Sequence, residues 1–271
     1  VGRILAALGP APAKTLDGLD DFAEFAREAL AGFRHRFHSA ADAAALLFVI
    51  AAARRDAGSV RSFFEREWRG EDPDVGGMLS RVVARVEGMD FRPALGVRSL
   101  PGGHPARFFF PDPAAGSACK RWNLYLRWMV RKDLLDFGLW PGIPAARLVI
   151  PTDTHIHLVA RRLGLTRRRS ADWRTAREIT DRLARFDPED PVRFDYALCR
   201  IGIFGICQSL RITSAPSSSI LPEPFSTSHS TSLTKSLPNG VRKNTSNSAR
   251  AGLTSNASSP FSKVMASSCW T

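Results

Sequence analysis

The segment at residues 150–165 reads Ile-Pro-Thr-Asp-Thr-His-Ile-His-Leu-Val-Ala-Arg-Arg-Leu-Gly-Leu. It predicts a helix that begins beside Asp153 and ends at Gly164, because aspartate is a favoured N-cap and glycine commonly ends a helix. A carboxylate at this position can also accept a proton or stabilise a developing positive charge. Asp153 is therefore either a helix cap alone, a role open to Thr152 as well, or a catalytic group.

A second segment places a lysine in the first turn of another predicted helix. Residues 113–121 read Pro-Ala-Ala-Gly-Ser-Ala-Cys-Lys-Arg, and the helix is expected over residues 118–132. The positive end of the helix dipole disfavours an ammonium at Lys120, and a neutral lysine amine can attack a sugar carbon and form a Schiff base. Lys120 and Asp153 would form a nucleophile and acid–base couple if the fold brings them together. The alternative for Lys120 is an ordinary solvated lysine.

The rest of the chain has the hydrophobic periodicity of helices and almost none of the alternation of strands. The predicted fold class is all-α. Further helices are expected at residues 16–33, 40–56, 60–68, 75–87, 171–186 and 191–205. Ser39, Ser59 and Ser170 are the expected caps of three of them. Residues 88–117, rich in proline and glycine, predict a long loop with one short strand at residues 108–110.

The composition changes sharply near Cys207. The body, residues 1–207, predicts one helical domain, whereas residues 208–271 are rich in serine and threonine and contain a single acidic residue, Glu223. This tail has no helical or strand period and is expected to be disordered. It is either a flexible extension or an out-of-frame translation. The chain starts at Val1 without a methionine, so targeting is left open.

Charge and hydropathy narrow the class of partner. The chain has 38 Lys and Arg residues against 26 Asp and Glu, a formal net charge of +12. A basic protein often binds a polyanion such as nucleic acid, although an arginine-rich codon bias gives the same composition. No apolar run approaches the roughly 20 residues that span a membrane, and the longest, residues 43–53, predicts a buried helix. We expect a cytoplasmic protein that does not enter a membrane.

Metal and cofactor motifs are missing from the sequence. The four cysteines are scattered, and no pair has the spacing of a zinc site. His155 and His157 would face different directions on a helix, so a shared metal site is not expected. Neither a phosphate-binding glycine loop nor a Gly-x-Ser-x-Gly motif is present. We therefore expect no cofactor and no metal.

The segment Pro-Thr-Asp-Thr-His-Ile-x-x-Val-x-x-Arg-Leu-Gly-Leu at residues 151–165 resembles the Val-Asp-Thr-His-x-x-Arg-Val motif of the helix–hairpin–helix DNA glycosylases, the endonuclease III superfamily. The resemblance implies a helix–hairpin–helix glycosylase-like fold in which Asp153 is catalytic. It also implies that Lys120 corresponds to the lysine of the bifunctional members, which follows a glycine-rich hairpin. The hairpin is degenerate here, because Gly116 lies four residues before Lys120 and the Gly-x-Gly pattern is missing.

The body resembles more closely a family of uncharacterised bacterial proteins, over about residues 18–207. The resemblance is carried by Lys-Arg-x-Asn-x-x-Leu-Arg-Trp-Met-Val-Arg-Lys at 120–132, Asp-Phe-Gly-Leu-Trp at 136–140, Ile-Pro-x-Asp-Thr-His at 150–155 and Phe-Asp-Pro-Glu-Asp-Pro-Val-x-Phe-Asp-Tyr-Ala-Leu at 186–198. Compared with this family, the chain is expected to lack the first helices and to have the Ser-rich tail in place of the usual end.

If the glycosylase resemblance holds, DNA is the expected partner. The residues expected to contact it are Gly116, Arg121, Arg127, Arg131, His155, Arg161 and Arg162, joined by residues 167–169. Each arginine has the alternative of a solvated helix face. Trp122, Tyr125 and Trp140 are expected either to stack on an extruded base or, by preference, to pack in the core. The iron–sulfur cluster of endonuclease III is not expected, because only Cys199 and Cys207 lie near the right end.

These observations leave three hypotheses. The first is a monomeric DNA base-excision enzyme, with glycosylase and abasic-lyase chemistry, in which Lys120 is the nucleophile and Asp153 activates it and stabilises charge. The second is a non-catalytic nucleic-acid-binding protein on the same scaffold. The third is an enzyme that acts on another substrate and shares only the fold. The distance between Lys120 and Asp153 separates the first hypothesis from the second.

Overall fold

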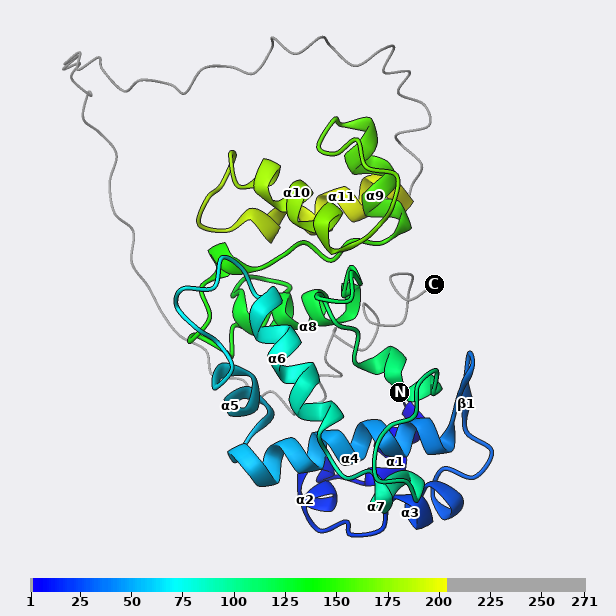
Figure 1. Cartoon of the computed structure of the whole chain (residues 1–271). Coiled ribbons are helices and arrows are strands. Elements are labelled where there is room, and N and C mark those ends of the chain that lie inside the picture. The colour runs from blue at the N-terminus through cyan, green and yellow to red at the C-terminus, as the bar shows by residue number, and fades with distance from the viewer. Residues whose placement is uncertain (1, 204–271) are drawn as a thin grey trace, which may run out of the picture. The chain divides into compact units, whose positions relative to one another are not determined.

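The structure is a computed structural model, and it describes residues 2–203 of the chain. These residues are mostly helical, which confirms the all-α prediction (Figure 1). The predicted tail, residues 208–271, lies outside the described residues. No helix among residues 2–203 is both long enough and apolar enough to cross a membrane.

Helix α4 (Ala40–Ala57) is the centre of the N-terminal half, and α2 (Pro12–Asp17), α3 (Phe22–Glu28) and α7 (Arg92–Leu95) pack against it (Figure 1). Its first turn is closed by a reciprocal pair of bonds between Ser39 and Asp42, which confirms the predicted cap. Gly58 ends it in the left-handed conformation. Helix α4 is buried on most sides, as its apolar sequence predicts, and α1 (Gly2–Leu8) precedes this group.

The single helix predicted over residues 16–33 is instead two helices. Helix α2 ends at Gly18, and α3 starts only after Asp21, whose carboxylate accepts a hydrogen bond from the Glu24 N–H at 2.7 Å. The aspartates near the start of the predicted helix therefore mark a second N-terminus, because Asp21 satisfies a backbone donor that would otherwise be open.

A short antiparallel hairpin follows α3 and was not predicted. Strands β1 (Arg34–His35) and β2 (His38–Ser39) pair His35 with His38, so that Arg36 and Phe37 form the turn. Arg36 has a φ of 57°, the left-handed backbone that tight hairpin turns require. The strands are too short to show an alternating pattern in the sequence.

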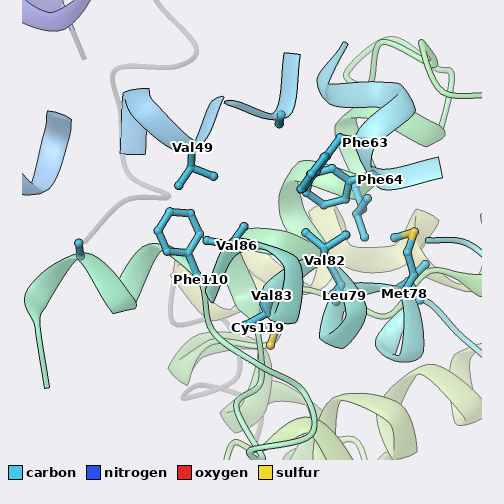
Figure 2. Close-up of a cluster of buried hydrophobic side chains, with 14 of the residues drawn as sticks. Val49, Phe63, Phe64, Met78, Leu79, Val82, Val83, Val86, Phe110 and Cys119 are labelled. Carbon is cyan, nitrogen blue, oxygen red and sulfur yellow. The ribbon is translucent and has the colours of Figure 1, made fainter. Parts of the chain in front are cut away.

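Helix α6 (Gly76–Glu87) supplies one wall of the hydrophobic core, next to α5 (Val60–Glu65). Its buried side chains follow the helical period, as predicted: Met78, Leu79, Val82, Val83 and Val86. Figure 2 shows them with Phe63 and Phe64 of α5 near Val82, and with Phe110 near Val86.

The long loop predicted at residues 88–117 contains two short helices, α7 and the 3-10 helix η1 (Pro105–Phe109). The prediction of a strand at residues 108–110 is wrong. Pro105 starts η1 with the backbone angle of a helix, and His104 Nδ1 accepts the Ala106 N–H at 3.2 Å. A run of three phenylalanines is typical of a strand, but the cap at His104 favours a 3-10 helix here.

The C-terminal half of the described chain contains the segments at residues 113–121 and 150–165. Its elements are α8 (Lys120–Val130), η2 (Ala145–Arg147), α9 (Thr154–Arg162), α10 (Trp173–Leu183), η3 (Pro191–Phe194) and α11 (Asp195–Ile203). The cap of α10 is Asp172 instead of Ser170, whose hydroxyl donates to the Asp172 carboxylate at 2.7 Å. The helix predicted from Pro191 starts as η3 and becomes α-helical only at Asp195.

Helices α9 and α11 pack very closely at Gly202. A Cβ atom at Gly202 would lie 2.9 Å from Cβ of His155 and 3.3 Å from its carbonyl oxygen. A glycine is therefore needed at this contact, and it fixes the backbone of α9 beside Asp153.

Candidate functional site

Lys120 and Asp153 face each other at the starts of two helices. Lys120 is the first residue of α8, and Asp153 is the N-cap of α9. The Lys120 Nζ lies 2.9 Å from Oδ2 of Asp153, and the side chains are 31% and 18% exposed. Both remain reachable from solvent, and both lie where a helix offers backbone N–H groups. The predicted couple is therefore in contact.

The second oxygen of Asp153 is also bonded. Its Oδ1 accepts the Ile156 N–H at 2.8 Å, which confirms the predicted cap. Burial raises the pKa of Asp153, but the Ile156 N–H and the Lys120 ammonium together hold that pKa below its usual value. Asp153 is thus a carboxylate near neutral pH.

Cys119 lies directly before Lys120 and is another nucleophile by residue type. It is buried, has a φ of 49°, and its Sγ lies 3.4 Å from the Pro111 carbonyl oxygen. Burial raises the pKa of the Cys119 thiol to about 12. A thiol that stays protonated is a poor nucleophile, so Cys119 is not suited to attack at neutral pH, and Lys120 is the candidate nucleophile of this adjacent pair.

Two of the arginines predicted to contact DNA are instead part of an internal ion-pair cluster. Arg127 is buried and pairs with Asp136 at 3.2 Å and with Asp195, while Arg131 pairs with Asp190 at 2.8 Å and with Asp136. Their guanidinium groups are held by carboxylates and shielded from solvent. Arg127 and Arg131 therefore do not belong to a nucleic-acid surface, and the prediction for them is wrong.

This cluster reaches toward the candidate site through Asp195, the first residue of α11. The pKa of Asp195 is raised to about 6, mainly by burial; Arg127 opposes this shift, and the nearby carboxylates Asp153 and Asp136 add to it. Asp195 and Asp153 are therefore close enough for their carboxylates to repel each other. The field of Asp195 favours positive charge beside Asp153, as on the Lys120 ammonium.

The outer side of α9 carries the other predicted contacts. His155, Arg161 and Arg162 are exposed, and within residues 2–203 neither arginine has an ion pair. The neighbouring segment continues the positive charge with Arg167 and Arg169, which are exposed as well. His155 lies near enough to Asp153 to lower its pKa.

Gly116 lies in a turn whose polar groups are already used. It has a φ of 84°; its N–H donates to the Pro113 carbonyl oxygen at 2.9 Å, and its own carbonyl accepts the Trp173 N–H at 3.1 Å. The N–H is therefore not available to a phosphate, as the prediction required. The turn lines an open pocket of about 760 Å³ together with Arg168, Arg174 and Arg177.

The three aromatic residues near α8 form a packed cluster around Phe64. Trp122, Tyr125 and Trp140 have ring centroids 5.2, 6.3 and 5.3 Å from the Phe64 ring. Trp140 is buried, and burial raises the pKa of Tyr125. Core packing is therefore their structural role, in line with the preferred alternative.

Several residues of this region escaped the sequence analysis. No motif pointed to Arg174 and Arg177 in the Gly116 pocket or to Phe108 beside Arg121. Asp136 and Asp195 lie in stretches that carry the family resemblance, but their role in the ion-pair cluster was not predicted. The spacing of Arg174 and Arg177 on one helix face was a signal for these two arginines. Within the described part of the chain, no group of three or more His, Cys, Asp and Glu side chains is arranged to hold a metal ion.

The arrangement defines a mostly helical protein with a paired lysine and aspartate at two helix starts. The family model described as "Protein of unknown function (DUF2400)" matches residues 1–204, so the chain belongs to this family. A search of curated proteins gave no match. A search of solved structures gave none either.

Proposed function

We propose that the protein is a DNA base-excision enzyme that cleaves the N-glycosidic bond of a damaged base turned out of the helix. Lys120 is the nucleophile, and Asp153 stabilises positive charge on the sugar. The observation that carries this proposal is the 2.9 Å contact between Lys120 Nζ and Asp153 Oδ2 at a place open to solvent. The resemblance of residues 151–165 to the helix–hairpin–helix glycosylases supports it.

The charge state of Asp153 decides its role. A carboxylate whose pKa lies below the usual value is a weak base, but it remains negative while a sugar becomes oxocarbenium-like. Asp153 therefore acts mainly through its charge, and Lys120 must lose one proton to solvent water before its amine can attack.

The proposed chemical step is an attack of Lys120 on the sugar of the damaged nucleotide. The neutral Lys120 amine forms a bond to C1′ of the sugar, and the base leaves with the electron pair of the N-glycosidic bond. The proton released by the new secondary amine goes to the departing base. The C1′–O4′ bond then breaks, O4′ takes the remaining N–H proton, and a Schiff base forms between Lys120 and C1′, which borohydride reduces to a stable amine.

Borohydride trapping tests the proposal. The protein is incubated with DNA that carries abasic or oxidised-base sites, reduced, and examined for a covalent adduct. We expect an adduct with the wild type, none with Lys120→Ala, and an unchanged yield with Lys14→Ala, a lysine exposed on α2. Absence of any adduct, or an adduct that survives Lys120→Ala, overturns the lysine mechanism.

A second candidate function is non-catalytic binding of nucleic acid. It is favoured by the exposed Arg161, Arg162, Arg167 and Arg169, and by the fact that capping of α9 accounts for Asp153 without chemistry. Salt-dependent DNA binding without an adduct for any lesion supports this alternative.

A further inference from the structure

The hairpin turn and η1 bring two exposed phenylalanines into contact. Phe37 is 48% exposed and Phe108 is 58% exposed, and their ring centroids lie 4.9 Å apart in an edge-to-face arrangement. Phe37 comes from the turn between β1 and β2, and Phe108 from η1. We call this pair the Phe37–Phe108 platform.

The platform has a fixed aromatic base. The ring of His38 lies 4.3 Å from that of Phe37 and stacks on Phe109, also at 4.3 Å. His38 is 4% exposed, and neither ring nitrogen has a hydrogen-bond partner within the described residues. Burial is the main cause that lowers the pKa of His38, so the ring is neutral near pH 7. An imidazole used in this way serves as a flat support.

Local geometry explains why only one phenylalanine of the run at 108–110 is exposed. A 3-10 helix has three residues per turn, so consecutive side chains point about 120° apart. Within η1, Phe109 lies under His38 and Phe108 points outward, and Phe110, the residue that follows η1, enters the core. The outward ring is held in place because its neighbours are packed.

Two arginines border the platform. The Arg121 Nη1 donates to the Phe108 carbonyl oxygen at 2.9 Å, and Arg36 occupies the same turn as Phe37. Burial, and after it the positive charge of Arg36, lower the pKa of Arg121, so the two guanidinium groups lie close enough to repel. Positive charge beside exposed rings suits a partner that offers flat faces and negative charge together.

Arg121 also connects the platform to the candidate site, because it follows Lys120 in the first turn of α8. One side chain of the first turn of α8 therefore contacts the platform, while the preceding side chain, Lys120, contacts Asp153. An apolar protein surface fits less well, since it would desolvate both arginines without compensation.

We propose that the Phe37–Phe108 platform binds unpaired bases of a single-stranded DNA segment by stacking, with Arg36 and Arg121 on the adjacent phosphates. The proposal rests on the nucleic-acid substrate of the proposed function, and it does not depend on the lyase chemistry. Proteins that bind single strands combine aromatic rings and basic side chains in this way, and one stacked base contributes about fivefold or more to affinity.

The test compares two labelled strands by fluorescence anisotropy. One is an oligothymidine, and the other has the same length and charge but carries tetrahydrofuran abasic sites, which cannot form a Schiff base. We expect the wild type to bind the base-bearing strand about tenfold more tightly than the abasic strand. The double variant Phe37→Ala/Phe108→Ala is expected to bind both strands equally, at the wild-type level for the abasic strand.

Two further variants serve as controls. Phe186→Ala removes another exposed phenylalanine, 71% exposed and beside Phe194, and is expected to keep the preference for bases. Phe108→Trp keeps an aromatic face and is expected to keep the wild-type preference for the base-bearing strand. Equal affinity of the wild type for both strands, or a preference that survives in the double variant, overturns the stacking proposal. A missing borohydride adduct alone overturns only the lysine mechanism.

Discussion

The guanidinium of Arg127 pairs with the carboxylate of Asp195, 68 residues further along the chain. Arg127 belongs to α8 and Asp195 opens α11, so this buried pair joins the helix that carries Lys120 to the helix that packs on α9. The position of Lys120 relative to Asp153 therefore depends on an ion-pair cluster behind the site. Its strength and its charge state can both be measured.

Removing Arg127 should destabilise the domain strongly. Arg127→Met leaves the buried carboxylate of Asp195 without its cation and Asp136 with Arg131 alone, and such a loss typically costs about 3–5 kcal/mol. Chemical denaturation measures the free energy of unfolding. The control is Arg193→Met, which breaks an exposed pair with Asp187 and should change little. Equal effects of the two substitutions would contradict the structural role of Arg127.

Asp195 should make stability fall as pH rises from about 4 to 6. Its pKa is raised to about 6 in the folded protein, from an ordinary value of 3.8, so the folded state binds more protons in this range. The unfolding free energy of the wild type relative to Asp195→Asn should therefore decrease across that window. Denaturation curves at several pH values provide the measurement, and a difference that stays constant or grows would refute it.

Two substitutions of Asp153 should separate its role as a helix cap from its role as a negative charge. Asp153→Asn keeps an acceptor for the Ile156 N–H but removes the ion pair with Lys120, whereas Asp153→Ala removes both. We expect Asp153→Ala to cost about 1 kcal/mol more than Asp153→Asn, because loss of a cap typically costs that much. Both substitutions should greatly reduce the borohydride adduct.

The contribution of Asp153 to stability should depend on pH with the opposite sign to that of Asp195. The pKa of Asp153 is lowered in the folded state, so its contribution to stability is present above the ordinary value and is lost as pH falls through the folded pKa. The advantage of the wild type over Asp153→Asn should shrink below about pH 4. An advantage that is independent of pH would show that the ion pair contributes nothing.

Gly202→Ala should destabilise the protein, although alanine favours helices over glycine. The added Cβ would lie 2.9 Å from Cβ of His155, so α9 and α11 must separate. Overpacking of this kind typically costs about 1–3 kcal/mol. Thermal denaturation measures the loss, and an increase in melting temperature would show that the contact can relax freely.

The exposed arginines of α9 should govern salt dependence. Arg161→Ala/Arg162→Ala is expected to weaken duplex DNA binding and to lower the slope of log affinity against log salt by about 2, because each phosphate contact contributes about 0.9. Anisotropy titrations over a salt series measure this slope. Arg193→Ala, an exposed arginine already paired with Asp187, is the matched control and should leave the slope unchanged.

The sequence alone determined the helical class, most of the helices and the two helix starts that carry Lys120 and Asp153. Those features are local: the apolar period of α6 and the caps at Ser39 and Asp153 depend on residues within a few positions of each other. Two predictions from local patterns were wrong for local reasons. Asp21 caps a new helix within one predicted helix, and Pro105 starts η1 where a strand was predicted.

The tertiary structure decided which side chains meet. A helix of period 3.6 shows that Arg127 and Leu126 lie on different sides of α8, but it does not show that Asp136 and Asp195 lie opposite the arginine and bury it. The same limit applies to Phe37 and Phe108, and to the contact between Lys120 and Asp153 that the motifs required. Contacts between residues far apart in the chain depend on how whole helices pack, and periodicity along one helix carries no information about its neighbour.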